Sequence, residues 1–237
     1  MKRLCQRPVF LGICLFIGLA ILCLSPLSHA EEPASLQEGI EQYKQENYEE
    51  AAEILKQVRQ QDPKSAMAAF FLGLSHKQMG DNDGARQQFE DAVTLDPPVK
   101  DAVVELIDVL NRTGKYDQAF KWIALAEKEG IDPAKIAFLK GMVLARTGKY
   151  TEAIASFEKS KELDGAYRQS ADMQIGLCYM GKREYRKASE RFQNAVTQDP
   201  LSDLAAYARR YQDISEQRRF AERPIRFSLG VMGQYDT

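Results

Sequence analysis

The pattern of hydrophobic and polar positions predicts short amphipathic helices over most of the chain. Between residues 32 and 202, apolar residues recur with the period of an α-helix, about 3.6 residues. Turn sequences separate these segments, such as MGDN at 79–82 and RTGK at 112–115. Gly80 and Gly114 can end the helices that precede them, because glycine adopts the left-handed conformation at little cost. The pattern therefore predicts helices that are joined in hairpins by glycine-containing turns.

The hairpins recur at a fixed interval along the chain. The pentapeptide RTGKY occupies residues 112–116 and again residues 146–150, which lie 34 positions later. An alanine recurs at spacings of 34, 34, 34 and 35 residues, at Ala51, Ala85, Ala119, Ala153 and Ala188. A period of this length indicates a repeat architecture. We therefore predict five repeats, over about residues 32–65, 66–99, 100–133, 134–167 and 169–202.

Other residue types keep fixed positions relative to this alanine. Twelve residues before it, the five repeats have Gly39, Gly73, Ile107, Gly141 and Gly176. Four residues after it, they have Leu55, Phe89, Ile123, Phe157 and Phe192. Small residues let two helix backbones approach closely, and residues four apart lie on one face of a helix. These positions therefore predict the contact between the two helices of each hairpin.

These positions together resemble the tetratricopeptide repeat, over roughly residues 32–202. Tyr116 and Tyr150 fit the same pattern, whereas the family's first-helix tryptophan is missing from every repeat. The resemblance implies an all-α fold, a right-handed solenoid of five helix-turn-helix repeats. The last repeat of a solenoid needs a polar cover for its apolar face. Residues 203–220 are apolar on one side and charged on the other, so we predict that they form this capping helix.

The resemblance also implies where a partner binds. The first helices of such repeats line a concave groove, in which family members hold a peptide or a partner helix. The groove residues in this register are Leu36, Ile40, Tyr43, Phe70, Leu74, Lys77, Val104, Asp108, Asn111, Phe138, Met142, Arg146, Met173, Leu177 and Met180. Most are apolar, and methionine suits an adaptable binding surface. The alternative is that many of them simply pack one repeat against the next.

The first thirty residues have the features of a secretory signal peptide. Three basic residues, Lys2, Arg3 and Arg7, precede an apolar run of sixteen residues, and Ser28 and Ala30 suit cleavage before Glu31. Sixteen helical residues span about 24 Å, less than the roughly 30 Å of a hydrocarbon core. We therefore predict a cleaved leader and export to the bacterial periplasm or the periplasmic face of the outer membrane. The alternatives are an uncleaved anchor and a eukaryotic secretory origin.

The composition after removal of the leader argues against catalysis, metal binding and nucleic-acid binding by this chain. The mature part has 29 basic and 34 acidic residues, so its net charge of −5 gives no support for nucleic-acid binding. Cys178 and His76 are then the only cysteine and histidine, which excludes an internal disulfide and a histidine pair for a metal. We predict a chain without a catalytic residue, metal or cofactor, whose partner is a protein or peptide.

The end of the chain changes from a helical to an alternating pattern. After Pro224, apolar residues such as Phe227, Leu229 and Val231 alternate with small or polar ones, which indicates a strand within residues 221–237. The segment resembles the opening strand of an outer-membrane barrel that follows a periplasmic tetratricopeptide domain. We expect a chain truncated at Thr237. The alternatives are an ordinary frayed tail and a strand that pairs with a partner.

The sequence thus predicts a non-catalytic scaffold or adaptor in the cell envelope. Under the barrel interpretation, it is the periplasmic domain of an outer-membrane export protein. Two other interpretations remain: a stand-alone secreted adaptor, or the regulatory domain of an enzyme whose catalytic part lies outside this chain.

Overall fold

A computed structural model describes residues 35–96 and 98–221 of the chain. The chain divides into two units, Met1–Pro33 and Ala34–Thr237, and all of the described residues belong to the second. The predicted signal peptide and the predicted strand of the C-terminal tail lie outside the described residues. Their interpretation therefore stays a prediction from the sequence.

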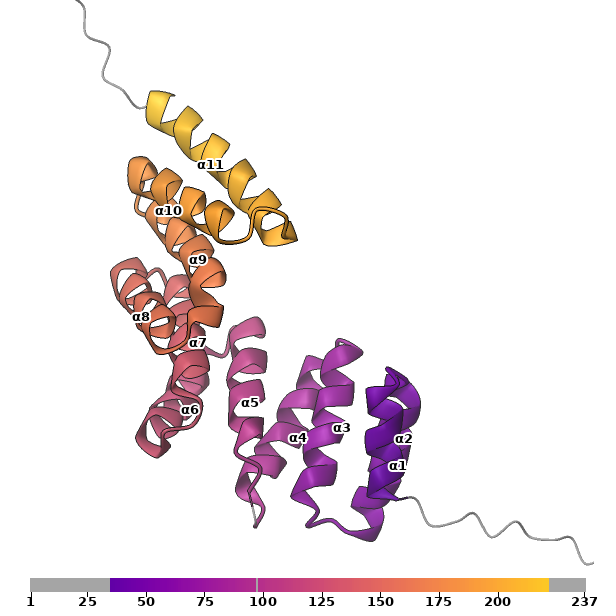
Figure 1. Cartoon of the computed structure of the whole chain (residues 1–237). Coiled ribbons are helices and arrows are strands. Elements are labelled where there is room, and N and C mark those ends of the chain that lie inside the picture. The colour runs from indigo at the N-terminus through magenta and orange to yellow at the C-terminus, as the bar shows by residue number, and fades with distance from the viewer. Residues whose placement is uncertain (1–34, 97, 222–237) are drawn as a thin grey trace, which may run out of the picture. The chain divides into compact units, whose positions relative to one another are not determined.

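The described residues form eleven α-helices and one short 3₁₀ helix, with no strand among them (Figure 1). The helices are α1 Leu36–Lys44, α2 Tyr48–Gln61, α3 Ala66–Gln78, α4 Asn82–Thr94, α5 Asp101–Arg112, α6 Tyr116–Glu129, α7 Pro133–Arg146, α8 Tyr150–Leu163, η1 Gly165–Tyr167, α9 Arg168–Gly181, α10 Tyr185–Gln198 and α11 Asp203–Ala221. The all-α fold class that the sequence predicts is confirmed. None of the described helices is long and apolar enough to cross a membrane.

The helices pack in the order of the chain. Each one contacts the next, and the first helices of neighbouring hairpins also contact each other, as α1 does α3 and α7 does α9. Local contacts of this kind are the mark of a solenoid, in which every hairpin is stabilised by its neighbours. The odd-numbered helices α1 to α9 are the first helices of the five hairpins, and their surfaces include the predicted groove.

Close helix contacts occur where the repeat places small residues. A Cβ atom added at Gly176 would lie only 2.4 Å from Cε1 of Phe192, and one at Gly141 only 2.6 Å from Cε1 of Phe157. The alanines that define the repeat, Ala51, Ala85, Ala119, Ala153 and Ala188, are fully buried. In the third repeat, Ile107 replaces the glycine, and its partner is the smaller Ile123 in place of phenylalanine. The sizes of the two facing residues therefore compensate for each other: a glycine faces a large side chain, and the larger Ile107 faces a smaller one.

The turns inside the hairpins use left-handed backbone conformations. Gly80, Gly114 and Gly148 have φ values of 82°, 74° and 76°, and each follows the C-cap residue of the first helix in one of the three middle repeats. Glu46 and Arg183 have the corresponding conformation in the first and last repeats, with φ values of 65° and 59°. Glycine adopts this conformation without strain, whereas a side chain there has a steric cost.

The last hairpin is covered by α11, where the sequence predicts a capping helix. Ala205 and Ala208 of α11 are fully buried, and the ring of Tyr211 stacks on that of Phe192 with a centroid distance of 5.7 Å. The opposite side of α11 is exposed and carries charged residues, among them Arg209 and Arg210. The helix therefore buries the apolar side of the last repeat and presents a polar surface.

Candidate functional site: the face of the first helices

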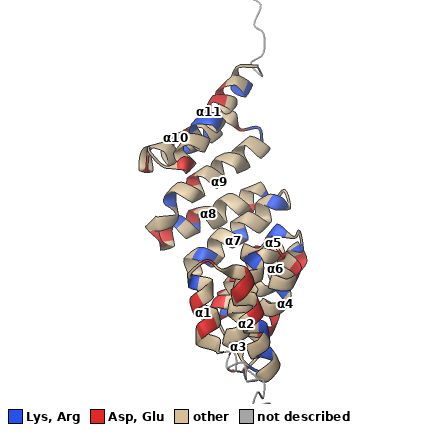
Figure 2. Cartoon of the chain, turned by 90° about the vertical axis from the view of Figure 1, so that its right-hand side faces the viewer, with Lys and Arg blue, Asp and Glu red and all other residues tan. Residues whose placement is uncertain are grey.

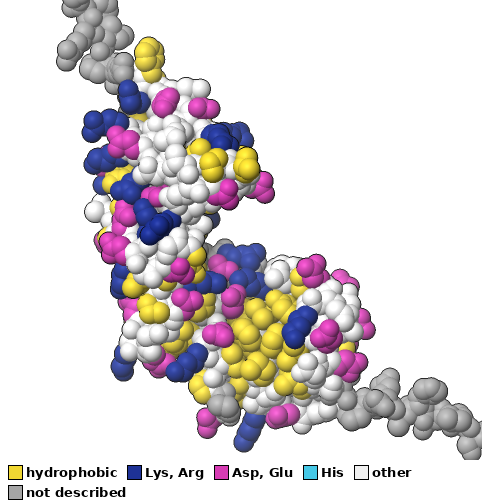
Figure 3. Space-filling view, viewed as in Figure 1, with side chains coloured by type: hydrophobic (Ala, Val, Ile, Leu, Met, Phe, Trp, Pro, Cys, Tyr) yellow, Lys and Arg dark blue, Asp and Glu magenta, His cyan; other side chains and the backbone are white. Residues whose placement is uncertain are grey.

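Hydrophobic side chains gather on one face of the middle of the described chain. Figure 3 shows them over α3, α4 and α5. The hydrophobic core here includes the buried Val104 and Ile107 of α5, and the half-buried Phe70 and Leu74 of α3 pack against it. Only Phe70 and Leu74 of these four keep accessible apolar surface, and surface of this kind is typical of a binding face. Three of these four residues, Phe70, Leu74 and Val104, belong to the predicted groove.

A cluster of three charged residues lies beside this apolar face. Nζ of Lys77 in α3 is 2.6 Å from Oε2 of Glu105 and 2.6 Å from Oδ2 of Asp108, both in α5. Burial on its own would lower the pKa of Lys77, but hydrogen bonds to Asp108 and Glu105 outweigh it and the pKa is raised. Lys77 is therefore fully charged, and the cluster carries one net negative charge. Because the cluster has two carboxylates and one ammonium group, it can accept a hydrogen bond from a further donor, such as a peptide N–H or a basic side chain.

Glu105 is absent from the groove that the sequence predicts. It lies three residues before Asp108, so both side chains are on one face of α5. That spacing is a signal that could have found it. What the sequence could not show is that Lys77 lies between the two carboxylates, since that pairing depends on the packing of α3 against α5.

A mainly apolar hollow of about 310 Å³ lies between α7 and α9. Its lining consists of Met142, Ala145, Arg146, Tyr150, Gln174, Leu177 and Cys178. Ligand pockets have volumes of about 300–1,000 Å³, so this hollow lies at the lower end of that range. The predicted groove residues Met142, Arg146 and Leu177 are brought together here, and Gln174 and Tyr150 are additions that the sequence did not indicate.

The polar side chains that line this hollow include Arg146, Gln174 and the thiol of Cys178. Arg146 is exposed and has no ion-pair partner in residues 35–96 and 98–221, so its guanidinium is available to an incoming carbonyl or carboxylate. Gln174 adds an amide with both a donor and an acceptor. Burial raises the pKa of the Cys178 thiol to about 11, so it is protonated at neutral pH and is not a nucleophile.

The remaining predicted groove residues differ in how much surface they expose. Leu36, Ile40, Tyr43, Phe138 and Met180 are half-buried. Asn111 and Met173 are only 6% and 5% exposed, so little of either side chain is open to a partner. The ring of Phe138 is 5.3 Å from that of Phe157, and that of Tyr43 is 5.6 Å from that of Phe71. Packing within and between repeats therefore covers much of the side-chain surface of Phe138 and Tyr43.

A second charged cluster lies outside this face and joins α8, α9 and α10. Asp172 of α9 is only 2% exposed. Its carboxylate is 2.6 Å from Nζ of Lys161, 2.7 Å from Nε2 of Gln198 and 3.2 Å from a guanidinium nitrogen of Arg191. A buried carboxylate with three donors is fully satisfied, which indicates a structural role.

The residues that could carry other chemistry are few. His76 pairs with Asp81, the N-cap residue of α4, through a distance of 2.9 Å between Nδ1 and Oδ2. No group of three or more histidine, cysteine, aspartate or glutamate side chains in the described part of the chain is arranged to hold a metal ion.

The comparison with protein families finds two models, and both describe the same family. Models of the tetratricopeptide repeat match residues 36–98, 72–134 and 134–167, which together span more than half of the chain. No curated protein matches the sequence closely enough to count as a relative.

Solved structures of several repeat proteins are similar to the described fold. One is YrrB, described as a TPR protein with an unusual peptide-binding site: the identity is 22% and the TM-score 0.60, over 74% of this chain and 90% of that one. The thermophilic TPR protein TTC0263 of Thermus thermophilus has 19% identity and a TM-score of 0.59, over 74% and 96% of the two chains. MamA of Desulfovibrio magneticus RS-1 has 18% identity and a TM-score of 0.63, over 70% and 94%. At these identities the likeness concerns the fold.

Proposed function

The chain belongs to the tetratricopeptide repeat family, and on that premise we propose that it is a non-catalytic scaffold that holds a peptide or protein segment along its first helices. The observation that carries this proposal is the hollow between α7 and α9. It combines apolar walls with the exposed guanidinium of Arg146 and the amide of Gln174. An extended peptide offers the complementary groups, since it has an apolar side chain and free backbone carbonyls.

The rest of the face extends the same surface. The apolar area over α3 to α5 can bury further side chains of the partner (Figure 3). The carboxylates of Glu105 and Asp108 exceed the single positive charge of Lys77, so they favour a donor on the partner at that point. The peptide-binding site in the printed description of YrrB supports the same type of partner. The pKa of Cys178 supports the absence of thiol chemistry in the hollow.

The experiment is a selection of peptides from a display library by the purified protein. Affinities of the selected peptides are then measured for Leu177→Glu and Arg146→Ala. We expect each change to weaken binding about tenfold or more, equivalent to about 1.4 kcal/mol. The matched control is Leu163→Glu, because Leu163 is half exposed on the second helix α8. If the selected peptides bind Leu177→Glu and Arg146→Ala as tightly as the wild type, the binding site lies elsewhere.

We also propose that this scaffold works in the bacterial cell envelope, as the periplasmic part of an outer-membrane export protein. The support is the leader-like sequence of residues 1–30 and the alternating pattern that follows Pro224. Mass spectrometry of the protein from its native cells should find Glu31 as the first residue, and fractionation should recover the full gene product with the outer membrane. A retained leader, or a stop codon directly after Thr237, would contradict the respective part of this proposal.

A further inference from the structure

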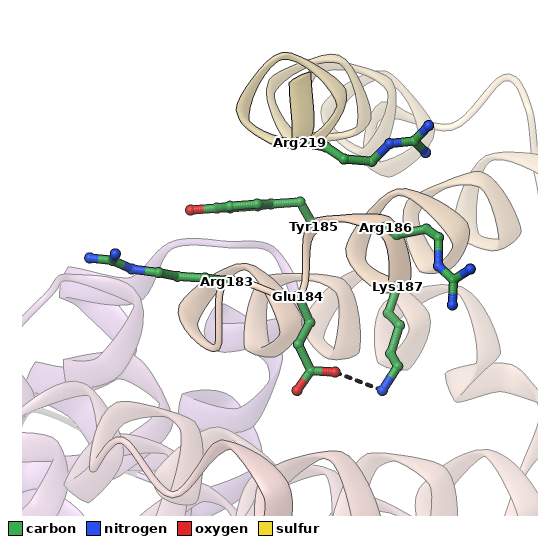
Figure 4. Close-up of a pocket in the computed structure, with 6 residues that line it drawn as sticks. All are labelled: Arg183, Glu184, Tyr185, Arg186, Lys187 and Arg219. Atoms are coloured by element: carbon green, nitrogen blue, oxygen red, sulfur yellow. Dashed lines mark hydrogen bonds and ion pairs between the residues drawn. The ribbon is translucent and has the colours of Figure 1, made fainter. Parts of the chain in front are cut away.

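The turn inside the last hairpin forms a basic hollow, outside the groove. Its volume is about 330 Å³, and its lining is Arg183, Glu184, Tyr185, Arg186, Lys187 and Arg219. Figure 4 shows that Arg219 comes from α11 and lies across from the other five residues, which belong to the turn after α9 and the start of α10. Four basic side chains therefore stand against one carboxylate.

Much of this positive charge has no internal partner. Glu184 is paired with Lys187 at 2.7 Å and with Lys182 at 3.0 Å. Arg186 reaches only Glu190, at 3.8 Å, and both side chains are mostly exposed. Arg183 and Arg219 have no ion-pair partner within 4.0 Å in the part of the chain that the structure describes. The hollow therefore presents unneutralised guanidinium groups to solvent.

The turn inside the first hairpin forms a hollow of the opposite charge. Its volume is about 410 Å³, and its lining is Glu46, Asn47, Tyr48, Glu49, Glu50 and Met79. None of the three carboxylates has an ion-pair partner among residues 35–96 and 98–221. The lining contains no basic side chain, so this hollow is acidic throughout.

The two hollows occupy equivalent positions of the repeat. Counted back from the repeat alanines Ala51 and Ala188, Glu46 corresponds to Arg183, at the fifth residue before the alanine. Two residues before the alanine, the first repeat has Glu49 and the last has Arg186. Directly before the alanine, the first repeat has Glu50 and the last has Lys187. Three charges are thus inverted, position by position, between the two ends of the repeat array.

The middle repeats do not have this arrangement. At the position of Glu46 and Arg183 they have Gly80, Gly114 and Gly148, and all five residues adopt a positive φ. A charged side chain is therefore present only in the first and last repeats, at a position where glycine is free of steric strain. The charge of residues 35–221 is divided in the same sense. Residues 35–112 have 15 acidic and 8 basic residues, whereas residues 113–221 have 15 acidic and 19 basic residues.

We propose that copies of this chain associate end to end, with the acidic hollow of one copy against the basic hollow of another. Figure 2 shows acidic positions in red on α1 and both acidic and basic positions on α11, whereas the two hollows lie at the turns that follow α1 and α9. The complementary charges and the unpartnered guanidinium and carboxylate groups identify a second copy as the occupant of each hollow. The contact joins two different surfaces, so association continues into larger assemblies unless the arrangement closes into a ring. No residue of the predicted groove lines either hollow, so we expect this assembly to be independent of peptide binding.

The first test is sedimentation velocity of the purified protein at several concentrations and two ionic strengths. The Debye length is about 30 Å in 0.01 M salt and about 3 Å in 1 M salt. We expect concentration-dependent association at the lower ionic strength and a monomer at the higher one. A monomer under both conditions would overturn the proposal, as would association that salt does not weaken.

The second test exchanges the charges. Arg183→Glu with Arg186→Glu reverses the basic hollow, and Glu46→Arg with Glu49→Arg reverses the acidic one. Each double variant should lose self-association, because both of its ends then have the same charge. A mixture of the two double variants should associate again, and a single chain with all four changes should associate as the wild type does. Association that survives either reversal would show that the interface lies elsewhere.

Matched controls separate these effects from general changes in charge or folding. Lys121→Glu with Lys159→Glu makes the same change in net charge as the reversal of the basic hollow, at exposed residues of second helices, and should leave association unchanged. Leu177→Glu should lose peptide affinity but associate normally, so failure of the groove proposal is distinguishable from failure of this one. Arg183→Gly should raise the melting temperature, because it relieves the positive φ, and at the same time weaken association.

Discussion

Gly176 shows at the scale of one residue why the repeat has small residues at fixed positions. The space above its Cα is filled by the ring of Phe192, which is fully buried. The ring cannot move away, since the ring of Tyr211 stacks on it. Close-packed interiors respond to a single added methyl group, because neither side chains nor backbone have free volume to occupy.

Gly176→Ala should therefore destabilise the protein by about 1–3 kcal/mol, even though alanine favours a helix by up to about 1 kcal/mol over glycine. The matched control is Gly165→Ala, where an added Cβ would lie 3.6 Å from its nearest neighbour, an ordinary contact. Urea denaturation of both variants measures the difference. Equal stabilities would mean that the contact between α9 and α10 is looser than the structure shows.

Cys178 gives the second prediction at this scale. Burial raises the pKa of its thiol from 9.0 to about 11. Because the folded pKa is the higher one, the thiol stabilises the fold below pH 9, and this stabilisation is lost as the pH rises towards 11. Two pKa units correspond to about 2–3 kcal/mol. Denaturation of the wild type across this pH range should show a fall in the free energy of unfolding that Cys178→Ala lacks. The prediction is refuted if the free energy changes with pH in parallel for the two proteins.

At the scale of helices, charged contacts differ greatly in how much they stabilise the fold. The carboxylate of Asp172 is buried and joins α9 to α8 through Lys161 and to α10 through Arg191 and Gln198. By contrast, Arg186 and Glu190 form an exposed pair within α10. Exposed pairs contribute about 0–1 kcal/mol, whereas loss of one partner from a buried cluster leaves uncompensated charge.

Asp172→Ala should therefore cost about 1–3 kcal/mol, because Gln198 loses its acceptor and Lys161 and Arg191 lose a shared partner, although both still pair with Glu158. Glu190→Ala should change the free energy of unfolding by less than about 0.5 kcal/mol. Chemical denaturation of the two variants gives both values. A small effect at Asp172 would indicate that water or Glu158, which pairs with both Lys161 and Arg191, replaces the lost carboxylate.

At the scale of the whole molecule, stability is a sum over neighbouring hairpins. Each helix contacts mainly the next one, so no single core holds all of the hairpins together. The buried clusters reflect this, since that of the last repeat and α11 is separate from the large cluster around α5. A destabilising substitution at one end of the array should therefore unfold only the helices near it.

Ala208→Asp tests this locality, because it places a carboxylate at a fully buried position of α11. Hydrogen exchange should show loss of protection in α9 to α11 and unchanged protection in α1 to α4. Ala206→Asp is the matched control, since Ala206 is exposed on the same helix. Loss of protection along the whole chain would show that the array unfolds as one unit.

The sequence alone determined the elements and their register. Helix period, turn glycines and the repeated alanine are local signals, and they sufficed to predict an all-α solenoid with a capping helix. They also predicted the buried contact of Gly176 and the fully buried Ala153. Each hairpin depends on residues close together in the chain, so its fold could be derived without the structure.

Only the tertiary structure decided which residues of the groove face are open. Met173 and Asn111 are buried, whereas residues at the same register in other repeats, such as Phe70 and Met180, are half-buried. The pairing of Lys77 with Glu105 and the hollow that contains Gln174 depend on the spacing between hairpins, which no local pattern encodes. The physical reason is that a repeat fixes the face on which a side chain lies, whereas its exposure depends on the volume of the neighbouring repeat.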